Sequence, residues 1–214
     1  MVHLASFAVL FLKMLSSRSV EGISLKTQEL YLLVFVTRYL DLFHIPTFTF
    51  LHVYNTCMKI IYIAASATIV YYIRRKNPWK ASYKKQEDSF MHLQFAIAPC
   101  AALALLIHSE FTIVELFWTF SIYLEAVAIM PQLILMQRFG NVENLTANYV
   151  ACLGAYRALY ILNWIYRLYY EDHYHSSKAT WIVWISGVVQ TALYCDFFYY
   201  YALSKWYNKT MLPQ

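Results

Sequence analysis

The chain has 214 residues, of which 60% are hydrophobic, 19% aromatic and only 14% charged, and its net charge is +5. About a quarter of the residues of an ordinary soluble domain are charged, so the composition excludes that class. Only 4 Gly and 5 Pro are present, too few for many short strands joined by tight turns. We therefore predict a single all-α membrane domain over residues 1–214.

Seven apolar stretches follow one another along the chain, and we predict that each forms a transmembrane helix. They lie at residues 2–16, 28–44, 47–73, 92–109, 112–136, 149–169 and 180–204. A helix needs about 20 residues to cross the hydrocarbon core of a bilayer, so the first stretch is short for a complete crossing.

The connections between these stretches differ in their content of basic residues. On one side, the connections at 17–27, 74–91 and 137–148 and the tail at 205–214 together hold eleven Lys and Arg. On the other side, the connections hold a single basic residue, Lys178. Because Lys and Arg are enriched in cytosolic loops, we predict that the N-terminus is outside the cell or lumenal and that the tail is cytosolic.

Two segments indicate an internal repeat. The segment TQELYLLVFVTRYL, at 27–40, aligns with TANYVACLGAYRAL, at 146–159, at a constant offset of 119 residues. Three apolar stretches lie between the two copies, which predicts two three-helix repeats joined by a linker helix. In transporters built from such parallel repeats, the binding site lies between the repeats.

Ionisable residues inside the apolar stretches are the strongest functional signal. They are the basic residues Lys13, Arg38, Lys59, Arg157 and Arg167 and the acids Asp41, Glu115, Glu125 and Asp196. Five lipid-facing basic groups, at roughly 2.5–3.5 kcal/mol each, would cost on the order of 15 kcal/mol. Most of these groups must therefore face one another or a wet cavity. We expect Lys13, close to a helix end, to snorkel to the membrane surface, and Lys59 and Asp196 to form a structural pair.

The segment 154–167, GAYRALYILNWIYR, places two of these Arg on one helix. Arg157 and Arg167 are ten residues apart, within about 80° of one helical face and about 15 Å apart in height. That spacing suits an extended ligand with several acidic groups, because Arg binds carboxylates through a bidentate fork. Tyr156, Tyr160, Asn163 and Trp164 recur at spacings of three and four and would lie near the same face; such a stripe is also typical of simple packing.

Glu115 and Glu125 repeat the ten-residue spacing with the opposite charge. Glu115 lies near the predicted lumenal end, and Glu125 lies deeper, where it either pairs with an Arg or holds a proton. His3 lies inside an apolar stretch. A buried His near a carboxylate can switch its charge between about pH 5 and 8, although a lone His is often only a satisfied core residue.

Several blocks of the chain resemble the KDEL receptor family, the endoplasmic-reticulum (ER) lumen protein-retaining receptors. They are RYLDLF, YNTCMK, WTFSIYLEAVAIMPQL, YRALYILNWIYR and VVQTALYCDFFYYY, and they recur in order over nearly the whole chain. The resemblance implies a seven-helix fold similar to SWEET and PQ-loop transporters. It also implies a retrieval receptor of ER and early Golgi membranes that binds C-terminal KDEL/HDEL-type tails at acidic pH and returns their owners in COPI vesicles.

The resemblance also implies roles for individual residues. Arg38 and Tyr39 would take the terminal carboxylate of the tail, and Arg157, Arg167, Asn163 and Trp164, with Tyr160 beside them, would serve its acids. Asp41 and Glu115 would meet the Lys or His four residues from the end, with Trp118 stacking on it. His3, Tyr156 and Glu125 would form the pH switch, and Lys205 and Lys209 the coat-binding part of the tail. The chain begins later than is usual in the family and lacks an N-terminal Arg that contacts the ligand.

Other functions remain open at this point. A small-solute transporter of the SWEET or PQ-loop kind would share the repeat and the Pro131-Gln132 pair, but a neutral sugar needs no intramembrane Arg. A seven-helix signalling receptor is a further alternative, against which the short chain argues. We expect no enzyme, because no nucleophile or metal set is recognisable, and no cofactor, metal or nucleic acid. The four Cys each lie in an apolar stretch without metal-type spacing.

Overall fold

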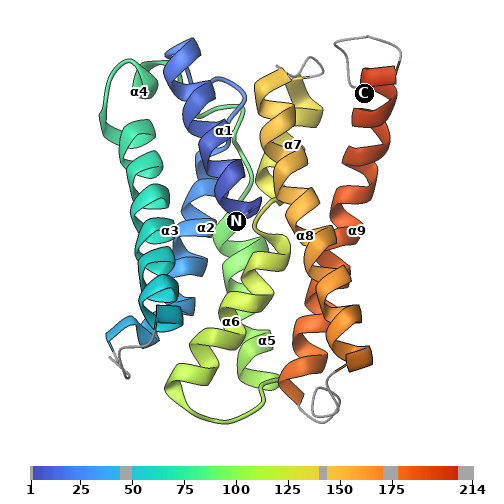
Figure 1. Cartoon of the computed structure of the whole chain (residues 1–214). Helices are drawn as coiled ribbons and strands as arrows, with labels where there is room; N and C mark the ends of the chain where they lie inside the picture. Colours follow the sequence, from blue (N-terminus) through green and yellow to red (C-terminus); the bar gives the residue numbers. More distant parts are fainter. Residues whose placement is uncertain (1, 44–49, 140–143, 171–177, 207–214) are drawn as a thin grey trace.

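The computed structural model describes residues 2–43, 50–139, 144–170 and 178–206, and within these ranges the chain is helical, without a strand (Figure 1). In chain order the elements are α1 (Val2–Ser17), α2 (Leu25–Arg38), the 3-10 helix η1 (Leu40–Phe43), α3 (Phe50–Arg75), α4 (Trp79–Ser82), the π-helix η2 (Leu93–Ile97), α5 (Ala98–Leu106), α6 (Ile113–Val127), α7 (Met130–Phe139), α8 (Asn144–Tyr170) and α9 (Lys178–Trp206). The predicted all-helical class is confirmed.

Three helices in the described ranges are long and apolar enough to cross a membrane: Phe50–Arg75, Ile113–Arg138 and Thr180–Tyr199. Two shorter apolar helices, His3–Ser17 and Leu93–Leu106, accompany them. The predicted stretch at 28–44 begins on α2, which ends at Arg38, and continues into the separate 3-10 helix η1, whereas the stretch at 149–169 falls on α8; α2 and α8 carry the Arg residues singled out above. The chain is therefore an all-helical protein with spans suited to a membrane.

The helices stand side by side in one bundle (Figure 1). α1 packs most extensively on α8, and α2 packs on α6 and on α3. The N-terminus of α1 lies midway along the length of the bundle (Figure 1). α6 and α7 follow one another with a break at 128–129, just before Pro131, whose missing N–H cannot continue the hydrogen-bond ladder.

One end of the bundle, which we call the α4 end, is tied together by buried polar contacts. Gln132 on α7 accepts a hydrogen bond from the backbone N–H of Ser24 at 2.8 Å and donates to the carbonyl of Gly22 at 2.7 Å. The Asp88 carboxylate accepts from the hydroxyls of Ser24 and Tyr83, both at 2.9 Å. Burial, and then the Asp88 charge, raise the pKa of Tyr83, so its phenol remains a donor.

Lys13 departs from its predicted position. Its side chain is only 1% exposed, in the part of α1 that the other helices cover. The prediction that Lys13 snorkels to the surface is therefore wrong. Position near a helix end suggested an exposed side chain, but the packing of α1 against its neighbours decides the exposure.

A candidate ligand-binding cavity between the helices

A cavity of about 510 Å³ lies between α1, α2, α3, α6, α8 and α9. Ten of the thirteen predicted ligand and pH-switch residues line it: His3, Arg38, Tyr39, Trp118, Glu125, Tyr156, Arg157, Tyr160, Asn163 and Trp164. These residues come from four helices that are far apart in the sequence. The volume suits a small molecule or the end of a peptide.

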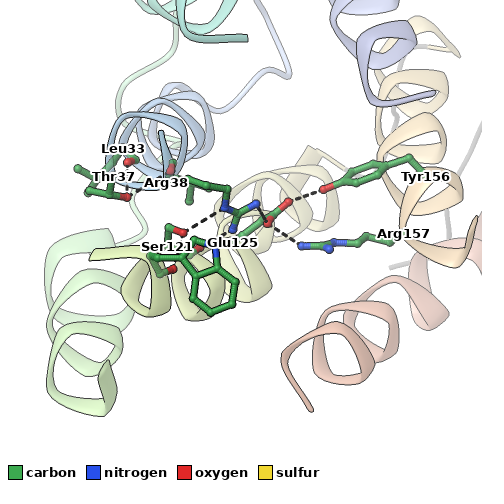
Figure 2. A network of polar contacts seen from close by, with 9 residues as sticks. Leu33, Thr37, Arg38, Ser121, Glu125, Tyr156 and Arg157 are labelled. Atoms are coloured by element: carbon green, nitrogen blue, oxygen red, sulfur yellow. Dashed lines mark hydrogen bonds and ion pairs between the residues drawn. The ribbon is translucent and has the colours of Figure 1, made fainter. Parts of the chain in front are cut away.

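Glu125 on α6 is the centre of the polar network in the cavity (Figure 2). Its Oε2 lies 2.5 Å from Nη1 of Arg38 and 2.8 Å from Nη2 of Arg157. Its Oε1 accepts a hydrogen bond from the hydroxyl of Tyr156 at 2.5 Å. One carboxylate thus brings together side chains from α2, α6 and α8.

Arg38 has further partners on α6. Its Nε donates to the Ser121 hydroxyl and its Nη2 to the Ser121 carbonyl, both at 3.1 Å. Arg157 is 8% exposed, and its Nε, shielded from solvent, has no hydrogen-bond partner among the described residues. Its guanidinium lies 5.4 Å from the ring of Tyr156 and 5.9 Å from that of Tyr160.

The network carries an excess of positive charge. Arg38 and Arg157 are two cations against the single carboxylate of Glu125. A buried charge without full compensation costs several kcal/mol, and the low dielectric strengthens any contact that an incoming anion makes. This part of the cavity is therefore suited to a negatively charged group such as a carboxylate, which two Arg can hold through paired hydrogen bonds.

His3 lies among aromatic rings next to this network. Its ring centroid is 4.3 Å from that of Tyr156, 5.2 Å from Phe7 and 5.4 Å from Tyr62. Both ring nitrogens are shielded from solvent and have no hydrogen-bond partner among the described residues. The start of α1 midway along the bundle is what brings His3 to the cavity.

One wall of the cavity depends on a glycine. Trp164 on α8 is 6% exposed and lies between Tyr160, at 5.9 Å between ring centroids, and Trp184, at 5.7 Å. A Cβ atom on Gly187 of α9 would lie 2.3 Å from Cζ3 of Trp164. Only glycine at this position leaves room for the indole as it is seated.

Three predicted ligand residues do not line the cavity. Asp41, on η1, forms an ion pair with Lys59 of α3 at 2.6 Å, so the partner of Lys59 is Asp41, whereas Asp196 was predicted. Glu115, in the first turn of α6, accepts a hydrogen bond from the hydroxyl of Ser109, which precedes that helix. Arg167 is exposed on α8. The side chains of Lys205 and Asp196, and all of Lys209, lie outside the described residues.

The sequence and its relatives assign this molecule to a family. The family model described as ER lumen protein retaining receptor matches residues 19–167. The chain belongs to this family. It is 54% identical over 212 residues to the ER lumen protein-retaining receptor of Petunia hybrida, covering 99% of this chain and 94% of that protein. The receptor of the same name from Plasmodium falciparum is 45% identical over 211 residues, covering 99% and 92%. That from Drosophila melanogaster is 48% identical over 199 residues, covering 93% and 88%. The resemblance stated from the sequence is thereby confirmed.

Sequence reasoning did not find every residue of the cavity in this family member. It missed a largely apolar set, namely Phe35, Tyr62, Ile122, Leu159, Val183, Ser186 and Gly187. Apolar side chains in an apolar helix carry no signal of what they face. Gly187 is the exception. A glycine inside a helix is less stable than an alanine by about 1 kcal/mol, so an isolated glycine there indicates that a neighbouring group packs closely against the helix.

Proposed function

We propose that this chain is a retrieval receptor that binds the C-terminal KDEL/HDEL-type tails of ER lumenal proteins in the cavity. The observation that carries this proposal is the positive excess of Arg38 and Arg157 around Glu125, in a chain of the ER lumen protein retaining receptor family. Binding favoured by acid and return in COPI vesicles are part of the proposal. Such a receptor needs no catalytic group.

The terminal carboxylate of the tail would enter at the network. All three N–H groups of Arg38 that have partners are directed at Glu125 or Ser121 in the absence of a ligand. An incoming carboxylate would therefore compete with Glu125 for Arg38, whereas Arg157 still offers its Nε, which has no hydrogen-bond partner among the described residues. The tail replaces part of an existing ion pair, so binding reorganises the network and does not simply fill a gap.

The pH dependence would come from His3. The tail brings three negative groups and one positive group, and its net negative charge favours the protonated imidazole. By linkage, protonation of His3 then favours binding of the tail to the same degree. Tyr156, which contacts both the His3 ring and Glu125, would connect the two events.

The outer residues of the tail would contact the part of the cavity lined by the aromatic and amide side chains of α8. Tyr160, Asn163 and Trp164 follow Arg157 along α8 and line the cavity, and Trp118 lines the α6 side. Asp41, Glu115 and Arg167 would contact the outer part of the tail from beyond the cavity wall. Lys59 now holds Asp41, so the Lys or His of the tail would have to displace the ammonium group of Lys59.

We also propose seven spans in two three-helix repeats, with α1–α3 equivalent to α6/α7–α9 and α5 as the linker. If α1 corresponds to α6 and α2 to α8, the extensive contact between α1 and α8 corresponds to the contact between α6 and α2, which is also extensive. Lys13 and Gln132 are 119 residues apart, as are Thr27 and Thr146, and all four are buried. The N-terminus would be lumenal, and the tail with Lys205 and Lys209 would face the coat in the cytosol.

The experiment is binding of a labelled peptide that ends in Lys-Asp-Glu-Leu to the purified full chain at about pH 5.5 and about pH 7.2, on either side of the histidine range. A C-terminally amidated peptide is the control, because it lacks the carboxylate for Arg38. Tight binding at the acidic pH only, lost on amidation, is the expected result. A folded protein that binds neither peptide, and that takes up small acidic solutes in proteoliposomes, would overturn the receptor proposal.

A further inference from the structure

Six basic residues lie between residues 74 and 85 at the α4 end of the bundle, and the cavity uses none of them. They are Arg74, Arg75, Lys76, Lys80, Lys84 and Lys85, and we call residues 74–85 the basic segment. The prediction of orientation used only the number of basic residues in each connection. Their individual partners in the structure carry more information.

Three of the six already have partners. Arg74 pairs with Glu29 at 2.8 Å. Lys84 pairs with Glu21 at 2.5 Å, and this hydrogen bond raises the pKa of Lys84. The ammonium group of Lys76 lies over the rings of Tyr72 and Trp79, at 4.6 and 5.7 Å.

The other three, Arg75, Lys80 and Lys85, are exposed and have no ion pair or aromatic partner within the described ranges. They leave three positive charges without local compensation on a segment of twelve residues. The acids of the neighbourhood face other groups: Glu29 pairs with Arg74, Glu21 and, at 3.7 Å, Glu87 with Lys84, and Asp88 accepts from Ser24 and Tyr83.

The basic segment is held firmly in place. The indole N–H of Trp79, 8% exposed, donates to the Met14 carbonyl of α1 at 2.8 Å. The Ser82 hydroxyl accepts from the backbone N–H of Val20 at 2.9 Å, and Tyr72 stacks on Trp79 at 4.8 Å between centroids. A ligand therefore meets positions that are already fixed, which lowers the ordering cost of binding.

Arg75 lies at the end of α3, next to exposed apolar and aromatic side chains that are suited to contact lipid. Among the described helices, α3 is one of those long and apolar enough to cross a membrane, and Tyr71, in its last turn but one, is 57% exposed. Arg75 follows Tyr71 by four residues, on the same face of the helix. Tyr is enriched at the level of the lipid headgroups, so Arg75, one helical turn further on, would reach the level of their phosphates. Leu12 and Leu15, on the adjoining helix α1, are also exposed.

We propose that the basic segment binds the phosphate-bearing headgroup of an anionic phospholipid. Arg75 holds the phosphate through its guanidinium fork, and Lys80 and Lys85, exposed on the same segment, add positive charge. The three paired residues shape the segment and leave these three available. The proposal is independent of tail binding in the cavity.

The test uses the full chain in detergent micelles and native mass spectrometry to count bound lipids. The probes are phosphatidylserine and phosphatidylinositol phosphate, with phosphatidylcholine as the neutral lipid. The test variant is Arg75→Gln/Lys80→Gln/Lys85→Gln. The matched control is Arg74→Gln/Lys76→Gln/Lys84→Gln, which removes the same charge from the same segment.

The test variant should lower the affinity for the anionic lipids on the order of a hundredfold, and the control less than tenfold. An equal loss in both variants, or in neither, would overturn the site. Soluble inositol phosphate is a separate arm, and its binding as tightly as the lipid would assign the site to free phosphates. An acidic peptide that binds in place of the lipid would assign it to a protein. The single variant Arg75→Gln, at an exposed helix end, serves if the triple variant does not fold.

Discussion

The close packing of Trp164 against Gly187 allows a quantitative prediction of how Gly187→Ala changes the affinity for the ligand. The added Cβ would lie 2.3 Å from Cζ3 and 2.6 Å from Cη2 of Trp164, far inside contact distance. Trp184 lies against the indole at 5.7 Å between centroids, and the cavity offers the open space. We therefore expect the indole to move into the cavity.

The magnitude follows from the cost of overpacking, about 1–3 kcal/mol for an extra methyl group in a packed site. If the indole of Trp164 occupies the space of the ligand, the ligand must displace it, and the energy of that displacement weakens the binding affinity. An energy of 1–3 kcal/mol corresponds to an affinity roughly 5 to 150 times weaker. The helix itself is not strained, since alanine is a better helix former than glycine.

The assay is anisotropy of a labelled tail peptide at acidic pH, together with thermal unfolding of each variant. Gly154→Ala is the matched control, because its Cβ would lie 2.4 Å from Cε2 of Phe198, outside the cavity. It should lower the unfolding temperature and leave the Kd unchanged. Trp164→Phe added to Gly187→Ala should relieve the clash and recover part of the affinity. Normal binding by Gly187→Ala, or equal losses in both glycine variants, would refute the reasoning.

Three further predictions concern the charged groups. Arg38→Ala should reduce tail binding at least a hundredfold with the helix content unchanged, because it removes one of two cations at Glu125; a monodisperse variant that still binds in a titration would contradict its role. His3→Ala should weaken binding at acidic pH and flatten the pH profile of the Kd, and an unaltered profile would remove His3 as the sensor. Lys59→Met should free Asp41 and strengthen binding of Lys-headed tails about tenfold relative to tails with Ala at that position. Equal effects on both peptides would show that Lys59 does not compete for Asp41.

Much of the candidate site could be predicted from the chain, because ionisable groups in apolar helices have few places to go. Arg38, Glu125 and Arg157 were each identified as expensive in lipid, and they lie together. Asp41 and Lys59 show the limit of this reasoning. Both were identified as charged residues in apolar stretches, but the sequence could not say that they pair with each other outside the cavity.

The sequence by itself determined the helical class of the protein and roughly where helices occur, since composition and apolar length do not depend on how the helices are arranged. It also determined the family, through motifs that recur in order. Only the tertiary structure decided which side chains face the cavity, because that depends on how each helix is rotated about its own axis. In the tertiary structure Lys13 is buried although it lies near a helix end, and Trp164 of α8 packs against Gly187 of α9. Such contacts join residues with no regular relation along the chain.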